Sequence, residues 1–231
     1  MNNFYTHDSN IECTKCSDID DCQFTKNNET SSINSDGWNL NNNPAYWGSS
    51  TPKVLVLGYS KGATQMKQGI KFNNIAFKGM RDRLRDILLL LKLVDKDVKI
   101  NDFFEKNTGD FGFASLIRCG ISYKGKTSGP LISKSFNSPA TKEIITNCVD
   151  TFFTDKLPKS VETIIFLGSS KIYKKKLSKH FANQFDNYRH IDDDSFFLGN
   201  VKCLFVAHPS PANGHFKKWL INNKEIYKKI S

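Results

Sequence analysis

The stretch KVLVLGYSKG, residues 53 to 62, runs from consecutive apolar residues into a turn that contains two glycines. An unbroken apolar run of this length is typical of a strand buried on both faces, as in a parallel sheet. The glycines after it expose backbone N–H groups, which can face an anion or a flat ring. The spacing is not that of the common nucleotide-binding loops, and a plain strand-to-helix turn is the alternative interpretation.

Three further apolar runs resemble the first and are predicted to be parallel strands: FASLIR (113–118), ETIIFLG (162–168) and KCLFVA (202–207). Helical periodicity lies between and after them, over residues 80–94, 139–153, 169–181 and 216–230. Strands that alternate with helices predict an α/β fold, here a three-layer sandwich with a central, mostly parallel four-stranded sheet and helices on both faces. Ligands of such sheets bind where the strands end, so residues 58–62, 115–119, 168–170 and 208–211 should converge.

The length of 231 residues predicts one domain, residues 1–231, and we expect a monomer. Residues 1–50 are rich in Asn, Ser and Asp and predict an irregular arm, and residues 120–138 predict a polar insertion loop. No stretch approaches the roughly 20 apolar residues of a membrane span, and the N-terminus does not resemble a signal peptide. A cytoplasmic protein that does not enter a membrane is therefore expected.

The formal net charge of +10 arises from 33 Lys and Arg against 23 Asp and Glu. Such an excess favours a polyanionic partner. A solvated helical face is the alternative interpretation, and charge alone does not separate the two. The lysines cluster in two segments: Lys171, Lys174, Lys175, Lys176 and Lys179, and then Lys217, Lys218, Lys224, Lys228 and Lys229.

Six cysteines in a reducing compartment are read as metal ligands, catalytic groups or core residues. Cys13 and Cys16 form a CxxC pair, Cys119 ends the second apolar run, and Cys148 lies in the next helical segment. Four thiolates in this pattern suit either a 4Fe-4S cluster or zinc. Cys22 is an alternative to one of the four, and Cys203, inside a strand, is read as a core residue.

The motifs together resemble the uracil-DNA glycosylase superfamily, most closely the members that hold a 4Fe-4S cluster. The resemblance spans roughly residues 13 to 220. Its parts occur in the family's order: Cys13 and Cys16, the strand ending at Gly58-x-x-x-Gly62, Gly69-Ile-Lys-Phe72, the strand running into Cys119, the helix with Cys148, IIFLGSS at 164–170, and His208-Pro-Ser-Pro.

The resemblance implies catalytic roles for three residues. His208 would stabilise negative charge on the departing base, which is electrostatic stabilisation of a transition state. In the family, a carboxylate or amide near Gly58 positions the attacking water. This chain has Gly58-Tyr59-Ser60 there, so the Ser60 hydroxyl and the Tyr59 backbone are the candidates. Ser60 is a weak base near neutral pH.

The resemblance also implies contacts with the base and with DNA. Phe72 would stack on the flipped base, Phe77 is a second candidate, and Gly58 would line the pocket. Ser115 stands at or near a position where relatives have Asn, and a hydroxyl cannot present the paired donor and acceptor of an amide. The expected DNA-binding residues are Lys61, Ser170, Lys171, Ser210, Pro211, Asn213, His215 and Lys217.

The predicted function is that of a monofunctional DNA glycosylase, which flips a base out of duplex or single-stranded DNA and leaves an abasic site. The base is expected to be uracil-like or a bulkier modified base, for example in phage DNA. The cluster would be structural. A catalytically silent nucleic-acid-binding module on the same fold is the alternative from another functional class.

Overall fold

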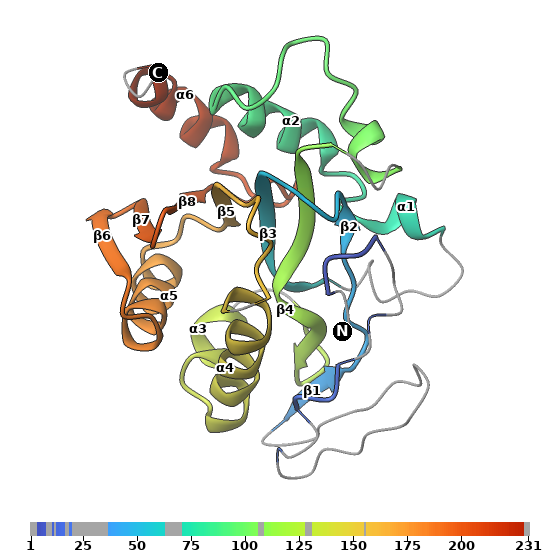
Figure 1. Cartoon of the computed structure of the whole chain (residues 1–231), viewed down its shortest axis with the longest axis vertical. Helices are drawn as coiled ribbons and strands as arrows, with labels where there is room; N and C mark the ends of the chain where they lie inside the picture. The colour runs from blue at the N-terminus through green and yellow to red at the C-terminus, as the bar shows by residue number, and fades with distance from the viewer. Residues whose placement is uncertain are drawn as a thin grey trace.

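The computed structural model describes residues 4–7, 11, 13–16, 19, 37–62, 71–105, 109–127, 131–154 and 156–228, with side chains as far as residue 223. Four parallel strands form its centre in the order β4-β3-β5-β8. They are β3 (Val54–Lys61), β4 (Phe111–Tyr123), β5 (Thr163–Leu167) and β8 (Val201–Val206). The four predicted strands are therefore confirmed as parallel neighbours (Figure 1).

The prediction of a four-stranded sheet is wrong, because the sheet is mixed and has eight strands. β1 (Trp38–Asn41) and β2 (Trp47–Gly48) pair antiparallel with β4. β6 (Tyr188–Asp192) and β7 (Ser195–Leu198) form a hairpin whose second strand pairs antiparallel with β8. These strands are two to five residues long, and β6 is mostly exposed. Short strands with little apolar content leave a weak sequence pattern.

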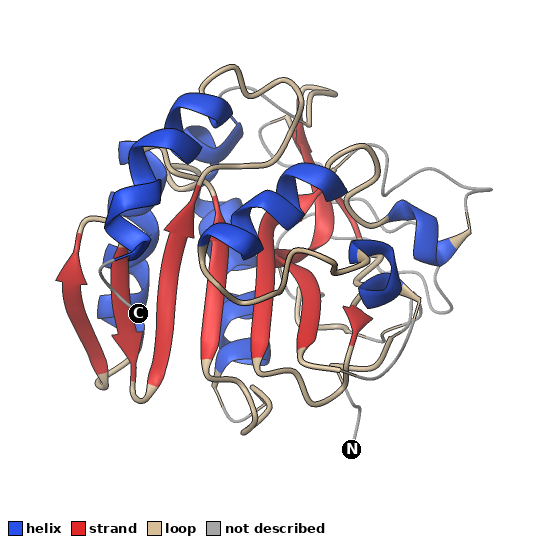
Figure 2. Ribbon diagram, turned by 90° about the horizontal axis from the view of Figure 1, so that it is seen from above, coloured by secondary structure: helices blue, strands red, loops and turns tan. Residues whose placement is uncertain are grey.

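Helices cover both faces of the sheet, as the top view in Figure 2 shows. On one face lie α3 (Leu131–Ser135), α4 (Pro139–Phe153) and α5 (Lys171–Gln184), and their core includes Leu57 and Ile164. On the other lie α1 (Phe72–Ile75), α2 (Arg81–Leu90), the 3-10 helix η2 (Ile100–Phe104) and α6 (Phe216–Lys228), packed on Val56 and Ile165. The three layers are thus present, and alternate residues of β3 face opposite layers.

The helix boundaries follow local chemistry. α4 begins at Pro139, where proline's missing N–H and fixed φ suit the first helical turn. α2 ends earlier than the predicted residue 94, because Lys92 adopts a left-handed φ of 55° that a helix cannot continue through. No helix among the described residues is long and apolar enough to cross a membrane.

The two segments predicted to be irregular contain regular structure. Residues 1–50 include β1 and β2, and Tyr5, Ile11 and Ile19 of the arm are buried in the core beside α4. In the segment 120–138, β4 continues to Tyr123 and α3 occupies residues 131–135. The expectation of a long irregular loop therefore does not hold for these residues, and a tight turn follows β4 instead.

Gly112 in β4 provides a test of this packing. A Cβ added there would lie 1.9 Å from the hydroxyl oxygen of Tyr46, a fully buried side chain that donates to the Ser49 carbonyl. Gly112→Ala is expected to lower the free energy of unfolding by about 1–3 kcal/mol through overpacking. Chemical denaturation measures this loss. Gly214→Ala is the control, since its Cβ meets no atom within 4 Å; equal effects of the two would contradict the packing argument.

Candidate functional site

His208 lies just beyond the end of β8, at the carboxyl edge of the parallel strands. Its Nδ1 accepts a hydrogen bond from the Ser210 backbone N–H at 3.1 Å. Burial lowers the pKa of His208 below its usual value, which favours the neutral ring. A neutral ring whose Nδ1 is an acceptor carries its proton on Nε2. The residue is therefore set up as a neutral hydrogen-bond donor.

Two side chains hold the loop that follows His208, one from the loop itself and one from α2. Asn213 Nδ2 donates to the His208 carbonyl at 2.8 Å, and Arg83 Nη1, from α2, donates to the Ser210 carbonyl at 2.7 Å. The Arg83 guanidinium also lies over the Phe216 ring, 5.0 Å from its centroid. The sequence reasoning missed Arg83, because nothing in its local pattern links it to a loop more than 120 residues away.

These bonds change the roles expected for the loop residues. The Asn213 side chain is engaged in holding the loop, and its Oδ1 accepts from the His215 backbone N–H. The Ser210 hydroxyl accepts from the Ala212 N–H. Pro211, His215 and Lys217 are exposed, so these side chains are the ones free to reach a strand of DNA.

Gly58 and Ser115 face each other across β3 and β4. They are register partners, and a Cβ on Gly58 would lie 3.5 Å from the Ser115 hydroxyl oxygen. Ser115 is buried, whereas Ser60, two residues along the same face of β3, is partly exposed. The absence of a side chain at Gly58 leaves the Ser115 hydroxyl without a Cβ against it on this strand.

The Tyr59 side chain lies on the opposite face of β3. Its hydroxyl forms a hydrogen bond with the Ser135 hydroxyl, and its ring meets the Tyr173 ring edge-on. Burial raises the pKa of the Tyr59 phenol. The side chain therefore cannot take part in chemistry beside Ser60, and only its backbone remains a candidate for that role.

The two aromatic candidates differ in their surroundings. Phe77 is buried between Phe104 and Phe113, with centroid distances of 5.9 Å to each, so it is a core residue and not a stacking platform. Phe72 is partly exposed and stacks on Trp47, with centroids 4.9 Å apart and planes 17° apart. Gly69 lies outside the described residues. Phe72 is the aromatic that can still offer surface to a ligand.

Two residues that the sequence reasoning missed hold Phe72. The Trp47 indole N–H donates to the Phe72 carbonyl at 3.1 Å. His7, from the N-terminal arm, meets the Phe72 ring edge-on, and its Nδ1 accepts from the Gly48 N–H at 3.0 Å. The arm thereby supports the same edge of the sheet that carries Phe72.

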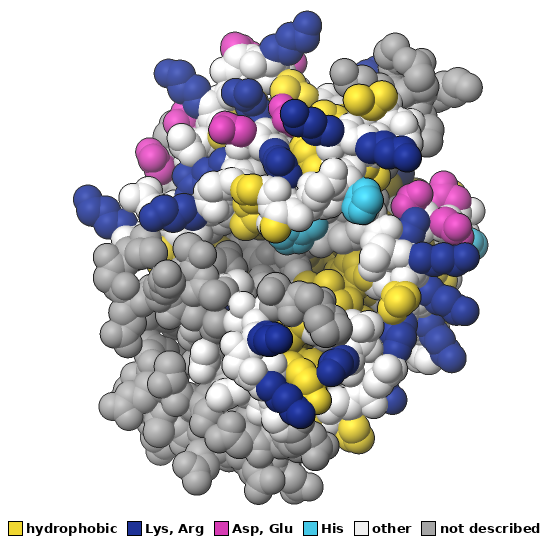
Figure 3. Space-filling model, turned by 180° about the vertical axis from the view of Figure 1, so that it is seen from behind, with side chains coloured by type: hydrophobic (Ala, Val, Ile, Leu, Met, Phe, Trp, Pro, Cys, Tyr) yellow, Lys and Arg dark blue, Asp and Glu magenta, His cyan; other side chains and the backbone are white. Residues whose placement is uncertain are grey.

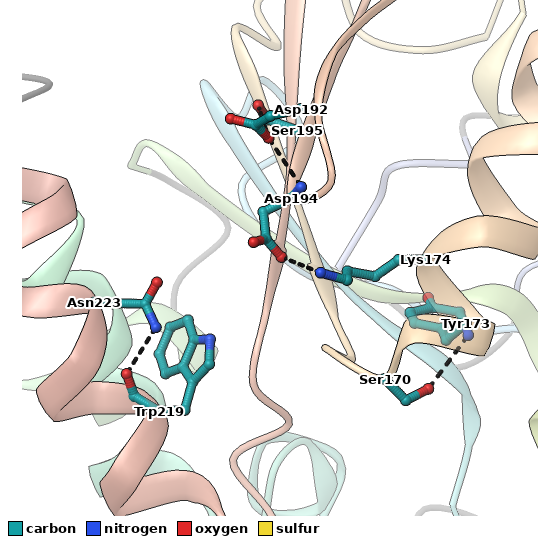
Figure 4. Close-up of polar contacts among 8 residues, drawn as sticks. All are labelled: Ser170, Tyr173, Lys174, Asp192, Asp194, Ser195, Trp219 and Asn223. Carbon is teal, nitrogen blue, oxygen red and sulfur yellow. Dashed lines mark hydrogen bonds and ion pairs between the residues drawn. The ribbon is translucent and has the colours of Figure 1, made fainter.

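The expected DNA-binding residues are not all at the surface. Lys61 is 5% exposed, and its ammonium group donates to the Asn43 carbonyl at 2.6 Å, so it does not lie where a DNA-binding lysine would. The Ser170 hydroxyl caps α5 by accepting from the Tyr173 N–H at 3.3 Å (Figure 4). Lys171 is exposed, whereas Lys174 is paired with Asp194 at 2.7 Å.

Lys and Arg side chains are common on this side of the molecule, with acidic side chains among them. Figure 3 shows His side chains beside a hollow, with Lys and Arg side chains gathered on the surfaces around it. A groove of about 640 Å³ lies between α4 and α5. It is lined by Lys142 of α4 and by Lys175, Lys176 and Lys179 of α5. Among the described residues that line this groove there is no Asp or Glu.

The four predicted cysteine ligands converge on one cavity. Cys13 and Cys16 come from the N-terminal arm, Cys119 from β4 and Cys148 from α4, and all four line the same space. Cys203 lies elsewhere, in β8, and Cys22 lies outside the described residues. Segments more than 100 residues apart in the sequence thus bring four thiols together.

The sulfur atoms of this cavity have hydrogen-bond donors near them. The backbone N–H groups of Lys15, Asn43 and Arg118 act on the sulfurs of Cys13, Cys119 and Cys148 respectively, where they partly oppose the rise in pKa that burial causes. Asn147 Nδ2 lies 3.9 Å from the Cys16 sulfur. Burial, the largest effect, raises the pKa of Cys13, Cys119 and Cys148. Buried thiolates need a compensating cation, and N–H donors to sulfur are typical around iron-sulfur clusters.

The donor set can be compared with the two candidate centres. The described residues include no group of three His, Cys, Asp or Glu side chains placed to hold a single metal ion. In a 4Fe-4S cluster each cysteine binds a different iron, so the four cysteine sulfurs do not all have to lie within bonding distance of one metal ion. The four cysteines therefore fit the cluster as a donor set, with zinc as the alternative that requires the sulfurs to draw closer.

Lys61 lies next to this centre. Burial lowers its pKa to about 8, and the nearby Cys119 opposes that shift by favouring the charged ammonium. Lys61 follows the β-bulge between Ser60 and Lys61, where β3 shifts register against β4. At this shift the Lys61 side chain is buried and its ammonium group donates to the Asn43 carbonyl.

Comparison with known families gives one match. A family model described as the Uracil DNA glycosylase superfamily matches residues 45–230. The matched region contains all four parallel strands, the His208 loop, Cys119 and Cys148, whereas Cys13 and Cys16 precede it. No curated protein matches the chain.

Proposed function

The chain belongs to the uracil DNA glycosylase superfamily, and from this premise we propose that it hydrolyses the N-glycosidic bond of a damaged or modified base in DNA. One observation carries the proposal. His208 stands at the carboxyl edge of the sheet as a neutral ring with its proton on Nε2. Gly58 and Ser60 lie on β3 and Ser115 on β4, and β5 stands between β3 and the strand that leads to His208.

The proposed chemistry needs a donor that acts on the leaving base. The bond between C1′ and the base nitrogen breaks, and its electron pair leaves with the base, which becomes an anion. The Nε2–H of His208 would donate to that anion, a stabilisation that grows as the charge develops. Water would then add to C1′ and lose a proton, leaving an abasic site. The Ser60 hydroxyl and the Tyr59 backbone would position this water.

The substrate class follows from Ser115. One hydroxyl offers a rotatable donor and two acceptor lone pairs, whereas an amide reads a base edge with a fixed donor and acceptor together. A site built this way discriminates weakly among base edges. We propose uracil-like deaminated bases and bulkier modified bases as the two substrate groups, the second of which would suit a defence against phage DNA.

A base-release screen tests the proposal. Oligonucleotides that carry single deaminated or modified bases, in duplex and single-stranded form, are incubated with the protein and then cleaved with alkali at abasic sites. We expect release from at least one of these substrates. Binding that persists and weakens with salt, without release from any base, would favour the silent nucleic-acid-binding module instead.

Arg83 offers a second test of the same site. Arg83→Met removes the hydrogen bond to the Ser210 carbonyl and the charge over Phe216, while an apolar side chain of similar length remains. Because the His208 loop would lose its support, we expect kcat for base release to fall by roughly tenfold to a hundredfold, as misplacement of a reacting group can do. Arg85→Met, on the same helix, is the control. Equal losses in both variants would contradict the positioning role.

We also propose that Cys13, Cys16, Cys119 and Cys148 hold a 4Fe-4S cluster. When bound, the cluster would join the N-terminal arm to β4 and α4 and carry no step of the glycosidic cleavage. Iron and acid-labile sulfide contents with a broad visible absorbance would support it. A colourless protein with one zinc per chain would overturn the cluster in favour of the alternative.

A further inference from the structure

Arg118, the residue before Cys119, is a charged side chain in the protein interior. It is 1% exposed. Among the residues that the structure describes, its Nε, Nη1 and Nη2 atoms make no hydrogen bond of good geometry, and the Tyr5 hydroxyl is the polar side-chain group that approaches the guanidinium. Buried arginines are normally paired with a carboxylate or bonded through several of their five N–H groups. Arg118 therefore requires an explanation.

Aromatic rings are the immediate neighbours of its guanidinium group. The central carbon lies 4.5 Å from the Phe152 ring centroid, 4.9 Å from that of Tyr5 and 5.6 Å from that of Tyr46. The negative faces of such rings attract a cation. This attraction does not replace the hydration that a buried charge loses, and a counter-charge is still needed.

The cysteine cavity is where that counter-charge would lie. Arg118 lines the same cavity as the four cysteines, and its own backbone N–H donates toward the Cys148 sulfur. The residues that line the cavity include no Asp or Glu. Among the described residues that line the cavity, the groups that can carry negative charge are therefore the sulfur atoms.

We propose that Arg118 is the internal counter-charge of an anionic centre formed by the four thiolates, and that it stabilises the more negative, reduced state of that centre. The proposal rests on the proposed cofactor. Four thiolates around a 4Fe-4S cluster or around one zinc ion leave a net negative charge in either case. A fixed buried cation next to a 4Fe-4S cluster lowers the energy of an added electron, so the reduction potential rises. Zinc has no such redox change, and next to a zinc ion the cation would only stabilise the four bound thiolates.

The experiment compares holoprotein variants of Arg118. Arg118→Met removes the charge and keeps an apolar stem between the rings, whereas Arg118→Lys keeps the charge. The reduction potential of the centre is measured by redox titration in each. In Arg118→Met, we expect the one-electron equilibrium to shift at least about tenfold toward the oxidised state, which is about 59 mV. Arg118→Lys should retain most of the wild-type potential.

A matched control and a second readout separate charge from packing. In the β6-β7 hairpin, the central carbon of the Arg189 guanidinium lies 4.4 Å from the Phe197 ring centroid. Arg189→Met should therefore remove a similar cation–ring contact and leave the reduction potential unchanged. Iron release to a chelator should be at least several-fold faster in Arg118→Met than in Arg118→Lys. If Arg118→Met does not fold, a retained potential and iron content in Arg118→Lys would still support the charge.

The outcomes distinguish this inference from the proposed cofactor. A wild-type protein without iron or zinc would overturn the metal centre itself. If the wild-type protein contains zinc, the reduction potential is not a readout. The rate of zinc release to a chelator is then compared between Arg118→Met and Arg118→Lys. A centre whose potential or release rate is the same in Arg118→Met as in Arg189→Met would overturn the role of Arg118 alone.

Discussion

Replacing His208 with alanine is expected to lower the rate of base release by about 10²- to 10³-fold, the usual effect of removing one donor aimed at a developing charge. DNA binding should be retained, because the phosphate contacts come from other residues. Single-turnover release on the best substrate of the screen measures the rate, and salt-dependent binding measures the affinity. His190→Ala, at an exposed position of β6, is the control and should release the base at nearly the wild-type rate.

The pH profile gives His208 a second signature. Burial lowers its pKa below the usual value of about 6.5, so the neutral donor prevails at neutral pH. As the pH falls through that lowered value, Nδ1 gains a proton, can no longer accept from the Ser210 N–H, and the rate should fall. The unfolded chain binds this proton more readily, so the contribution of His208 to stability is present above about pH 6.5 and lost below it. A rate that rises on acidification would contradict the neutral-donor role.

Replacing Cys148 with serine is expected to produce the largest change in the whole protein. The buried Cys148 comes from α4, whereas the other three proposed ligands come from the arm and β4. The binding free energy of a structural metal centre is also folding free energy. We therefore expect iron content to fall by more than about tenfold and the Tm to fall by about 10 °C or more.

The chain offers a matched control for this change. Cys203→Ser also replaces a buried thiol, but Cys203 lies in β8 and does not line the cysteine cavity. This variant should keep its metal content and lose only the small stability expected for a polar group placed in a core. A metal content in Cys148→Ser as high as that of the wild-type protein would contradict the proposed ligand set. A similar loss of metal in both variants would indicate general unfolding.

The sequence predicted the central architecture well because the physical signal was local. Four unbroken apolar runs indicated strands buried on both faces, and all four are parallel neighbours. α4 has the predicted bounds, 139–153, because Pro139 starts it and an apolar stripe runs through it. The hairpin of β6 and β7 was missed, since its exposed strand has no apolar alternation to reveal it.

The candidate site depended more on tertiary contacts. Arg83 and His7 support the His208 and Phe72 segments from distant parts of the chain, and neither position has a local motif. Lys61 looked like a surface lysine in a glycine-rich turn, yet it is buried at a β-bulge. Phe72 was the first candidate for stacking and Phe77 the second, and the packing of Phe77 on η2 and β4 shows that the second is a core residue.

The sequence by itself determined which residues could carry chemistry: the strand ends, the His208 loop and the four spaced cysteines. Only the tertiary structure decided what surrounds them. The proton position on His208 and the aromatic surroundings of Arg118 both depend on packing that no local pattern reveals, and the neighbours of Arg118 include Tyr5, Tyr46 and Phe152. Local pattern determines where a strand or helix forms, but the protonation and partners of a side chain depend on every element packed against it.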